Sequence, residues 1–175
     1  MWQWDCTFEK LFAARLTRYE RVAIIDADVY IYRNLDHLFE IDPGNSVVAP
    51  IAYWLPQPFF MSGGPLLIKT NKTAFVEVIE KKHGKKFGGE MDYLNEKFAK
   101  TAFFLNSSYT VLLSDWFQKN RNKTLELLSY REYVKPFLVH FIADLKPPLP
   151  PQKIEKMTPE GKNIYRDYML AYNSG

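Results

Sequence analysis

Residues 21–28 read RVAIIDAD, an unbroken apolar run that ends in two aspartates. A continuous run rich in β-branched residues is typical of a strand buried on both faces, as in a parallel sheet covered by helices. In extended backbone, side chains two residues apart point to the same side, so Asp26 and Asp28 are expected to face together. Both carboxylates would then reach one divalent cation at the carboxyl end of the strand, where open α/β sheets bind ligands. The same residues also fit two solvated carboxylates at a strand end.

The rest of the chain alternates between helix-like and strand-like patterns, and this alternation indicates an α/β fold. We expect helices over residues 5–19, 71–82 and 90–100, and a last helix that begins after a capping threonine at 158. The expected strands cover residues 22–25, 46–49, 66–68, 110–113 and 137–142. The sequence contains no internal repeat and no linker between two domains. We therefore expect a single domain over residues 1–175, in which 149–175 form a proline-rich segment and a last helix.

Composition excludes several classes of protein. The chain has 175 residues, of which 47% are apolar and 25% charged, the balance of a soluble globular domain. A net charge of +3 is too small to indicate a nucleic-acid partner. No apolar run approaches the ~20 residues that span a bilayer, so we expect no membrane segment in this chain. The single cysteine, Cys6, excludes an internal disulfide framework and any CxxC site.

Two further candidates lie late in the chain. His140 interrupts the apolar run 137–142 and fits either a metal ligand or a hydrogen-bonded core histidine. Mg²⁺ and Mn²⁺ favour oxygen ligands, and Mn²⁺ also accepts an imidazole. Lys146 precedes two prolines and fits either a point charge for a phosphate, held by a stiff loop, or an ordinary surface lysine.

The middle of the chain holds candidate sugar-facing residues. Glu90 and Asp92 stand at the expected start of a helix. They fit either a carboxylate facing a sugar or a favourable interaction with the helix dipole. The tripeptide at 62–64, Ser-Gly-Gly, either brings the backbone close to a ligand or forms a turn.

The order and spacing of these elements are more specific than any one of them. The series is KL at 10–11, LTRY at 16–19, RVAIIDAD at 21–28, NLDHLF at 34–39, SG at 62–63, DYLN at 92–95, VHF at 139–141 and KP at 146–147. It resembles glycosyltransferase family 8, the group of glycogenin and the bacterial α-galactosyltransferases. The resemblance covers about residues 7–148.

The resemblance implies a GT-A type, Rossmann-like domain that transfers a hexose or N-acetylhexosamine. The donor would be a UDP-sugar, the acceptor a carbohydrate or a protein, and the anomeric configuration would be retained. The family's metal ligands match Asp26, Asp28 and His140, which would hold Mn²⁺ or Mg²⁺.

The resemblance also assigns the remaining candidate residues. Lys146 would contact the donor diphosphate, and Lys10 would lie near the donor phosphate and sugar. Ala27, Ser62 and Gly63 would touch the donor as well. Glu90 and Asp92 are the carboxylates that would stabilise the oxocarbenium-like sugar during transfer.

The residues that depart from the family pattern are those expected to face the sugar, whereas the expected metal ligands match the family. An asparagine of the family is Met61 here, its Asp-Gln pair is Glu90-Met91, and the glycine and tryptophan after the HF and KP motifs are Ala143 and Pro148. Met91 offers no nucleophile and no hydrogen-bond donor. This version of the pattern is most similar to a eukaryotic branch that includes fungal N-acetylglucosamine transferases.

Family members begin with a strand and a helix that bind the uridine, and nothing before Trp4 matches these elements. We therefore expect an N-terminally truncated domain. Two other functions stay open. One is a truncated, non-catalytic transferase-like protein. The other is a phosphohydrolase of the haloacid-dehalogenase type, because residues 24–29 also fit its DxD signature, with Asp26 as nucleophile and Asp28 as acid and base.

Three N-x-S/T sequons begin at Asn71, Asn106 and Asn122, a mild excess over chance. They are compatible with a Golgi-lumenal parent protein that is anchored by sequence outside this chain. A cytoplasmic, glycogenin-like protein fits equally well.

Overall fold

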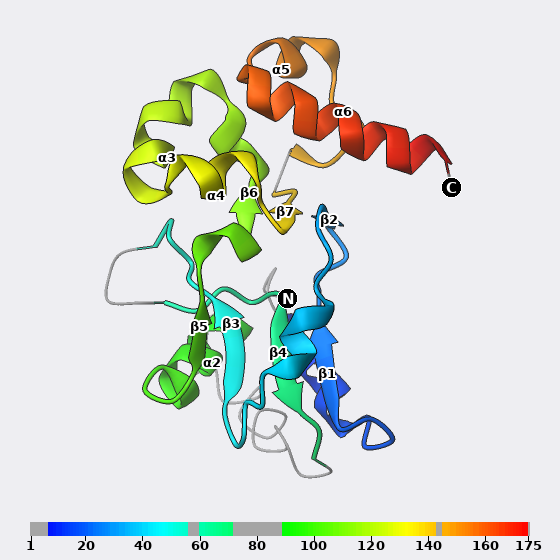
Figure 1. Cartoon of the computed structure of the whole chain (residues 1–175), viewed down its shortest axis with the longest axis vertical. Coiled ribbons are helices and arrows are strands. Elements are labelled where there is room, and N and C mark those ends of the chain that lie inside the picture. Colours follow the sequence, from blue (N-terminus) through cyan, green and yellow to red (C-terminus); the bar gives the residue numbers. More distant parts are fainter. Residues whose placement is uncertain (1–6, 56–59, 72–88, 143–144, 175) are drawn as a thin grey trace. The chain divides into compact units, whose positions relative to one another are not determined.

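The computed structural model describes residues 7–55, 60–71, 89–142 and 145–174 (Figure 1). The chain packs into two compact units: residues 1–26 with 36–106, and residues 27–35 with 107–175. Each unit contains its own sheet. The expected helix over 71–82 falls almost wholly outside the described residues. A single domain over 1–175 stays a prediction.

The first unit contains a four-stranded mixed sheet in the order β1-β4-β3-β5 (Figure 1). Its elements are η1 (Thr7–Arg15), β1 (Arg21–Ile24), η2 (Asp36–Glu40), β3 (Val47–Pro50), β4 (Leu66–Lys69), α2 (Glu90–Phe98) and β5 (Phe103–Leu105). β4 runs antiparallel to both β1 and β3, whereas β3 and β5 are parallel. The α/β expectation is therefore confirmed for this unit.

The position of β1 differs from the expectation of a parallel strand buried on both faces. Among the described residues β1 is an edge strand, it pairs antiparallel with β4, and only its last residue, Ile24, is buried. An unbroken apolar run does not by itself distinguish a central strand from an edge strand that is covered by other elements. The run is apolar here because β1 packs on η1.

The core of the first unit lies between the sheet, η1 and α2. Its side chains are those of Phe8, Leu11, Ala14, Ile24, Val47, Ala49, Met61, Leu66, Ile68, Tyr93, Leu94 and Phe98. The expected helix over 5–19 appears as the shorter 3-10 helix η1, which buries Phe8 and Leu11 but leaves Phe12 exposed; Leu16, just after it, is also exposed. The Arg21 guanidinium donates to the carbonyl of Phe39 at 2.5 Å and so ties β1 to η2.

The second unit contains a three-stranded sheet in the order β2-β7-β6 (Figure 1). Its elements are β2 (Val29–Ile31), η3 (Ser107–Tyr109), β6 (Val111–Leu112), η4 (Leu113–Trp116), η5 (Gln118–Asn120), α3 (Arg121–Leu127), α4 (Tyr130–Val134), β7 (Leu138–His140), α5 (Pro151–Glu155) and α6 (Pro159–Ser174). β7 is antiparallel to β2 and parallel to β6. Of these elements, β6, β7 and α6 were expected, whereas β2 and the short helices were not.

The β2–β7 register determines which side chains meet at one end of this sheet. Val29 pairs with His140, and the Asp28 carbonyl accepts a hydrogen bond from the Phe141 N–H at 2.9 Å. Asp28 therefore lies beside His140, although the two residues are far apart in the sequence. The sequence pattern missed this pairing because β2 has only three residues and no alternation of apolar and polar side chains.

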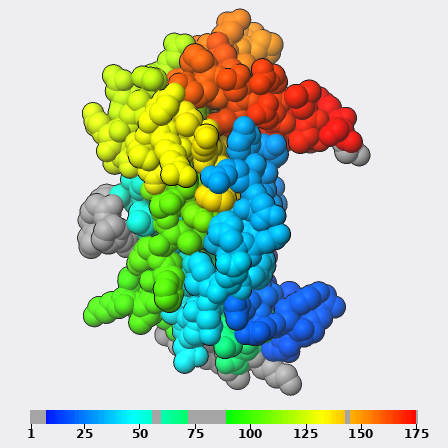
Figure 2. Space-filling model, viewed as in Figure 1, coloured from blue at the N-terminus to red at the C-terminus, as the bar shows by residue number. Residues whose placement is uncertain are grey.

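Helix α6 begins where the sequence indicated. Thr158 precedes it and its hydroxyl accepts a hydrogen bond from the Gly161 N–H at 3.2 Å, the arrangement of an N-cap. The helix buries Ile164 and Tyr165, while its last turns, red in Figure 2, are exposed and carry Tyr172. Among the described helices, none combines the length and the apolar character needed to cross a bilayer.

Gly161 provides a test of the packing in the second unit. A Cβ at position 161 would lie closer to the Trp116 side chain than two carbon atoms can approach. We expect Gly161→Ala to lower the free energy of unfolding by about 1–3 kcal/mol, because the added methyl group overpacks a filled site. Urea unfolding followed by circular dichroism measures this change.

The matched control is Lys162→Ala, because Lys162 is exposed on the same helix. Its effect should stay within about 0.5 kcal/mol. On helix propensity alone, Gly161→Ala would stabilise the helix by up to about 1 kcal/mol. A gain in stability would therefore contradict the described contact between α6 and Trp116.

Candidate metal and donor site

In the first unit, Lys10 joins two carboxylates. Its Nζ lies 2.8 Å from Asp26 Oδ1 and 2.7 Å from Glu90 Oε1, and it donates to the Gly63 carbonyl at 3.1 Å. The exposed fractions of the side chains are 17% for Lys10, 25% for Asp26 and 9% for Glu90, so solvent screens these pairs only partly. Burial alone would lower the pKa of Lys10, but the charges of Glu90 and Asp26 outweigh burial and raise it. The ammonium group therefore stays charged.

The glycine turn packs directly against this cluster. A Cβ at position 63 would lie 2.5 Å from Glu90 Oε1 and 2.9 Å from Lys10 Nζ, so any larger side chain would displace the ion pair. At Gly64 a Cβ would lie 3.5 Å from Asp26 Oδ2. The two glycines thus bring backbone atoms close to the charged groups, whereas the expected approach of this backbone to a ligand stays a prediction.

Asn95 fixes the residue before this turn. Its side-chain oxygen accepts from the Met61 N–H at 2.7 Å, and its amide group donates to the Met61 carbonyl at 3.2 Å and the Met91 carbonyl at 2.8 Å. The buried Asn95 amide thus faces the backbone of the neighbouring loop. Asn95 therefore orients the turn at 62–64.

In the second unit, two side chains lie close to the Asp28 carboxylate. The His140 Nε2 lies 3.2 Å from Asp28 Oδ1, and the Lys146 Nζ lies 3.2 Å from Asp28 Oδ2. Burial would raise the pKa of Asp28, but the hydrogen bond from Lys146 and the charges of His140 and Lys146 hold it below its usual value. The carboxylate therefore remains ionised, although it is partly buried.

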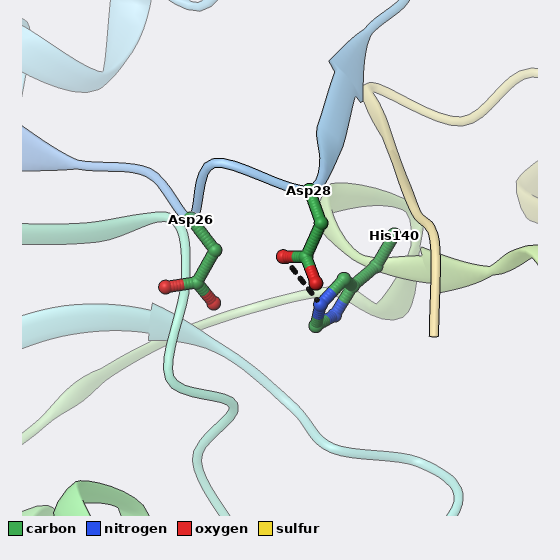
Figure 3. Close-up of side chains that lie close together, drawn as sticks. All are labelled: Asp26, Asp28 and His140. Atoms are coloured by element: carbon green, nitrogen blue, oxygen red, sulfur yellow. Dashed lines mark ion pairs between the residues drawn. The ribbon is translucent and has the colours of Figure 1, made fainter. Parts of the chain in front are cut away.

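Asp26, Asp28 and His140 are a group of possible metal ligands among the described residues (Figure 3). Each offers one ligand atom, and these atoms all lie within 4.8 Å of one another. Adjacent ligands of an octahedral ion with bonds of about 2.1 Å lie about 3 Å apart, which matches the distance from Asp28 Oδ1 to His140 Nε2. Two carboxylates and one imidazole suit Mn²⁺, so the donor set fits a divalent cation.

The other sequence-predicted residues occupy different environments. Ala27 and Asp92 are exposed, whereas Ser62 is buried and donates from its hydroxyl to the Gly64 carbonyl at 3.3 Å. Glu90 and Asp92 occupy the first and third positions of α2, and residues two apart on a helix do not share a face. Of these two carboxylates, Glu90 is the one that contacts Lys10.

Comparison with solved structures defines the class of fold. The glycosyltransferase GlyE of Streptococcus pneumoniae superposes with a TM-score of 0.60 at 20% identity, over 82% of this chain and 38% of GlyE. The galactosyltransferase LgtC superposes with a TM-score of 0.55 at 18% identity, over 81% of this chain and 59% of LgtC. The fold is therefore that of the GT-A type glycosyltransferases, as expected from the sequence.

Comparison of sequences finds transferases and a glycogenin among the relatives of this chain. Glucose N-acetyltransferase 1 of Gibberella zeae is 29% identical over 74% of this chain and 29% of its own length. Glycogenin-1 of Caenorhabditis elegans is 30% identical over 53% of this chain and 21% of its own length. No family model matches the sequence. The resemblance drawn from the motifs is confirmed: the chain is similar in sequence to glucose N-acetyltransferases and a glycogenin, and similar in fold to glycosyltransferases. It spans between 21% and 34% of the length of the curated relatives it matches.

The ion pairs of Lys10 can be tested by stability alone. We expect Lys10→Met to lower the free energy of unfolding by about 1–3 kcal/mol, because it leaves two partly buried carboxylates without their cation. The Glu90→Gln exchange removes one of these charges. Glu90→Gln should lower the free energy of unfolding less in the Lys10→Met background than in the wild type. Urea unfolding of the wild type, the two single variants and the double variant measures this difference.

The control is Lys100→Met, because Lys100 is exposed in the same unit and just follows α2. Its effect should remain within about 0.5 kcal/mol. Equal effects of Lys10→Met and Lys100→Met, or strict additivity of Lys10→Met and Glu90→Gln, would contradict the described cluster.

Proposed function

We propose that this chain carries the metal and donor-binding part of a retaining glycosyltransferase. The donor is a UDP-sugar, and the transferred group is a hexose or an N-acetylhexosamine. The acceptor is a carbohydrate or a protein. The observation that carries the proposal is the pairing of Asp28 with His140 and Lys146 at the end of β2 and β7, directly after the Asp26-Ala27 sequence.

Asp26, Asp28 and His140 would hold the divalent cation, with Mn²⁺ favoured by the imidazole. The cation supplies a Lewis acid for the negative charge that develops on the departing diphosphate. Lys146 is 60% exposed and sits on a flexible stem, so it is free to turn from Asp28 toward a phosphate oxygen. Lys10, held by Asp26 and Glu90, adds a second positive charge, near the donor sugar.

The sugar passes through an oxocarbenium-like state, which carries positive charge. Glu90 and Asp92 are the carboxylates proposed to stabilise it. Glu90 is the more rigid of the two because it is buried and paired with Lys10, whereas Asp92 is exposed. The buried turn at 62–64, fixed by Asn95, would present backbone groups rather than the Ser62 hydroxyl to the donor.

Two relatives guide the choice of donor. The names of the relatives are glucose N-acetyltransferase and glycogenin, and we therefore propose UDP-N-acetylglucosamine and UDP-glucose as the donors to test first. The phosphohydrolase alternative is disfavoured because the fold neighbours described above are glycosyltransferases. A non-catalytic, transferase-like protein remains the competing function, and it predicts no metal-dependent nucleotide binding.

Calorimetry tests the proposal on the purified chain. UDP should bind at least about tenfold more tightly in the presence of Mn²⁺ than in its absence, because an ion held by Asp26, Asp28 and His140 would offset the negative charge of the diphosphate. Asp28→Asn and His140→Gln should each weaken this Mn²⁺-dependent binding by about tenfold or more. Where binding is found, transfer from the two UDP-sugars is then compared.

Glu126→Gln is the matched control, because it removes one exposed carboxylate from α3 in the same unit. It should leave UDP binding unchanged within about twofold. UDP affinity that does not depend on Mn²⁺, or that Asp28→Asn leaves intact in a folded protein, would overturn the proposed donor site.

A further inference from the structure

A second candidate site lies within the second unit. It is a cavity of about 570 Å³ between η5, α5 and the residues after β7. This volume is within the range of small-molecule sites, which is about 300–1,000 Å³. None of its lining residues belongs to the metal and donor site described above.

The walls of the cavity are held together by backbone hydrogen bonds. The Gln118 N–H donates to the Lys156 carbonyl at 2.9 Å, and the Thr158 N–H donates to the Trp116 carbonyl at 2.6 Å. Phe117 and Met157 form an isolated antiparallel bridge between the same segments. The segment of η4 and η5 is therefore fastened to the end of α5, so that the cavity has a defined shape.

The side chains of the cavity combine three chemical characters. Lys119, Lys153 and Lys156 supply positive charge, and Phe117, Ile142 and Leu145 supply apolar surface. The remaining lining side chains are a serine, a glutamine and an asparagine. No carboxylate is among the lining residues that the structure describes.

Lys119, Lys153 and Lys156 line one cavity, and their charges favour an anion placed among them. Lysine recognises phosphate as a point charge and does so with three donors. The amide nitrogens of Gln118 and Asn120 already donate to backbone carbonyls, so their side-chain oxygens and the serine hydroxyl are the groups that suit the hydroxyls of a sugar. The apolar wall suits the C–H face of the sugar ring. An uncharged sugar would use only part of this lining.

We propose that this cavity is a binding site for a sugar phosphate, whose phosphate is held by Lys119, Lys153 and Lys156. The proposal does not depend on the metal and donor site, because the lining residues and the expected chemistry are different. A free sugar phosphate and a phosphorylated residue of a glycan share this chemistry.

The test is calorimetric titration of the chain with glucose 1-phosphate, glucose and inorganic phosphate, in the presence of a chelator so that no metal contributes. Glucose 1-phosphate should bind at least about tenfold more tightly than glucose, because only the phosphate engages the lysines. Raising the salt concentration should weaken its binding, since the contact is electrostatic. Equal affinity for glucose and glucose 1-phosphate, or for inorganic phosphate and glucose 1-phosphate, would overturn the assignment.

The variant that tests the lysines is Lys119→Gln/Lys153→Gln/Lys156→Gln. The matched control is Lys123→Gln/Lys135→Gln/Lys162→Gln, which removes the same charge from exposed positions of the same unit. The cavity variant should lose at least about tenfold in affinity for glucose 1-phosphate, and the control less than about threefold. Equal losses of affinity in the cavity variant and the control would overturn the proposal. If the triple variant does not fold, the three single exchanges are compared instead.

Two further measurements separate this site from the donor site. Lys146→Gln, in the donor site, should leave the affinity for glucose 1-phosphate unchanged within about threefold. The cavity variant should in turn bind UDP in the presence of Mn²⁺ as the wild type does. Loss of glucose 1-phosphate binding in Lys146→Gln would contradict a separate cavity site, whatever the outcome of the Mn²⁺ and UDP titrations. A phosphorylated oligosaccharide that binds more tightly than glucose 1-phosphate would support the glycan source.

Discussion

Two carboxylates that lie two residues apart in the sequence need positive charge close by, and each has it within its own unit. Asp26 is paired with Lys10 in the first unit, and Asp28 with Lys146 and His140 in the second. Without these partners, two partly buried negative charges would stand on either side of Ala27, at a cost of a few kcal/mol. In the proposed function the same carboxylates and the imidazole of His140 hold a divalent cation, because ligands that already lie close together need little reorganisation to bind it.

Much of the surrounding structure serves to hold these partners in place. Lys10 is carried by η1, and the ion pair with Glu90 connects η1 to the start of α2. The glycine turn passes close to this pair because no Cβ stands in the way at Gly63, and Asn95 holds the residue before the turn. In the second unit, the pairing of β2 with β7 performs the same role for His140. Stability and the candidate function therefore depend on the same contacts.

The sequence indicated the α/β character, the GT-A resemblance and the residues that gather at the site, because these depend on local patterns and motif order. It did not indicate the edge position of β1, since an apolar run looks alike in a central strand and in a covered edge strand. It missed β2, which has too few residues for a periodic signal, and it missed the Asn95 contact with Met61. The cavity lysines Lys119, Lys153 and Lys156 were also missed, because only the folded chain brings η5 and α5 together.

The most direct test of the proposed metal site is to determine where on the chain Mn²⁺ binds. Mn²⁺ is paramagnetic, so a small amount added to the isotope-labelled chain broadens the NMR signals of nuclei near the ion. If Asp26, Asp28 and His140 hold the ion, the amide signals of residues 26–28 and the imidazole signals of His140 broaden first, and Asp28→Asn abolishes this effect. Broadening that begins at exposed carboxylates such as Asp42 and is unchanged in Asp28→Asn would contradict the proposed metal site.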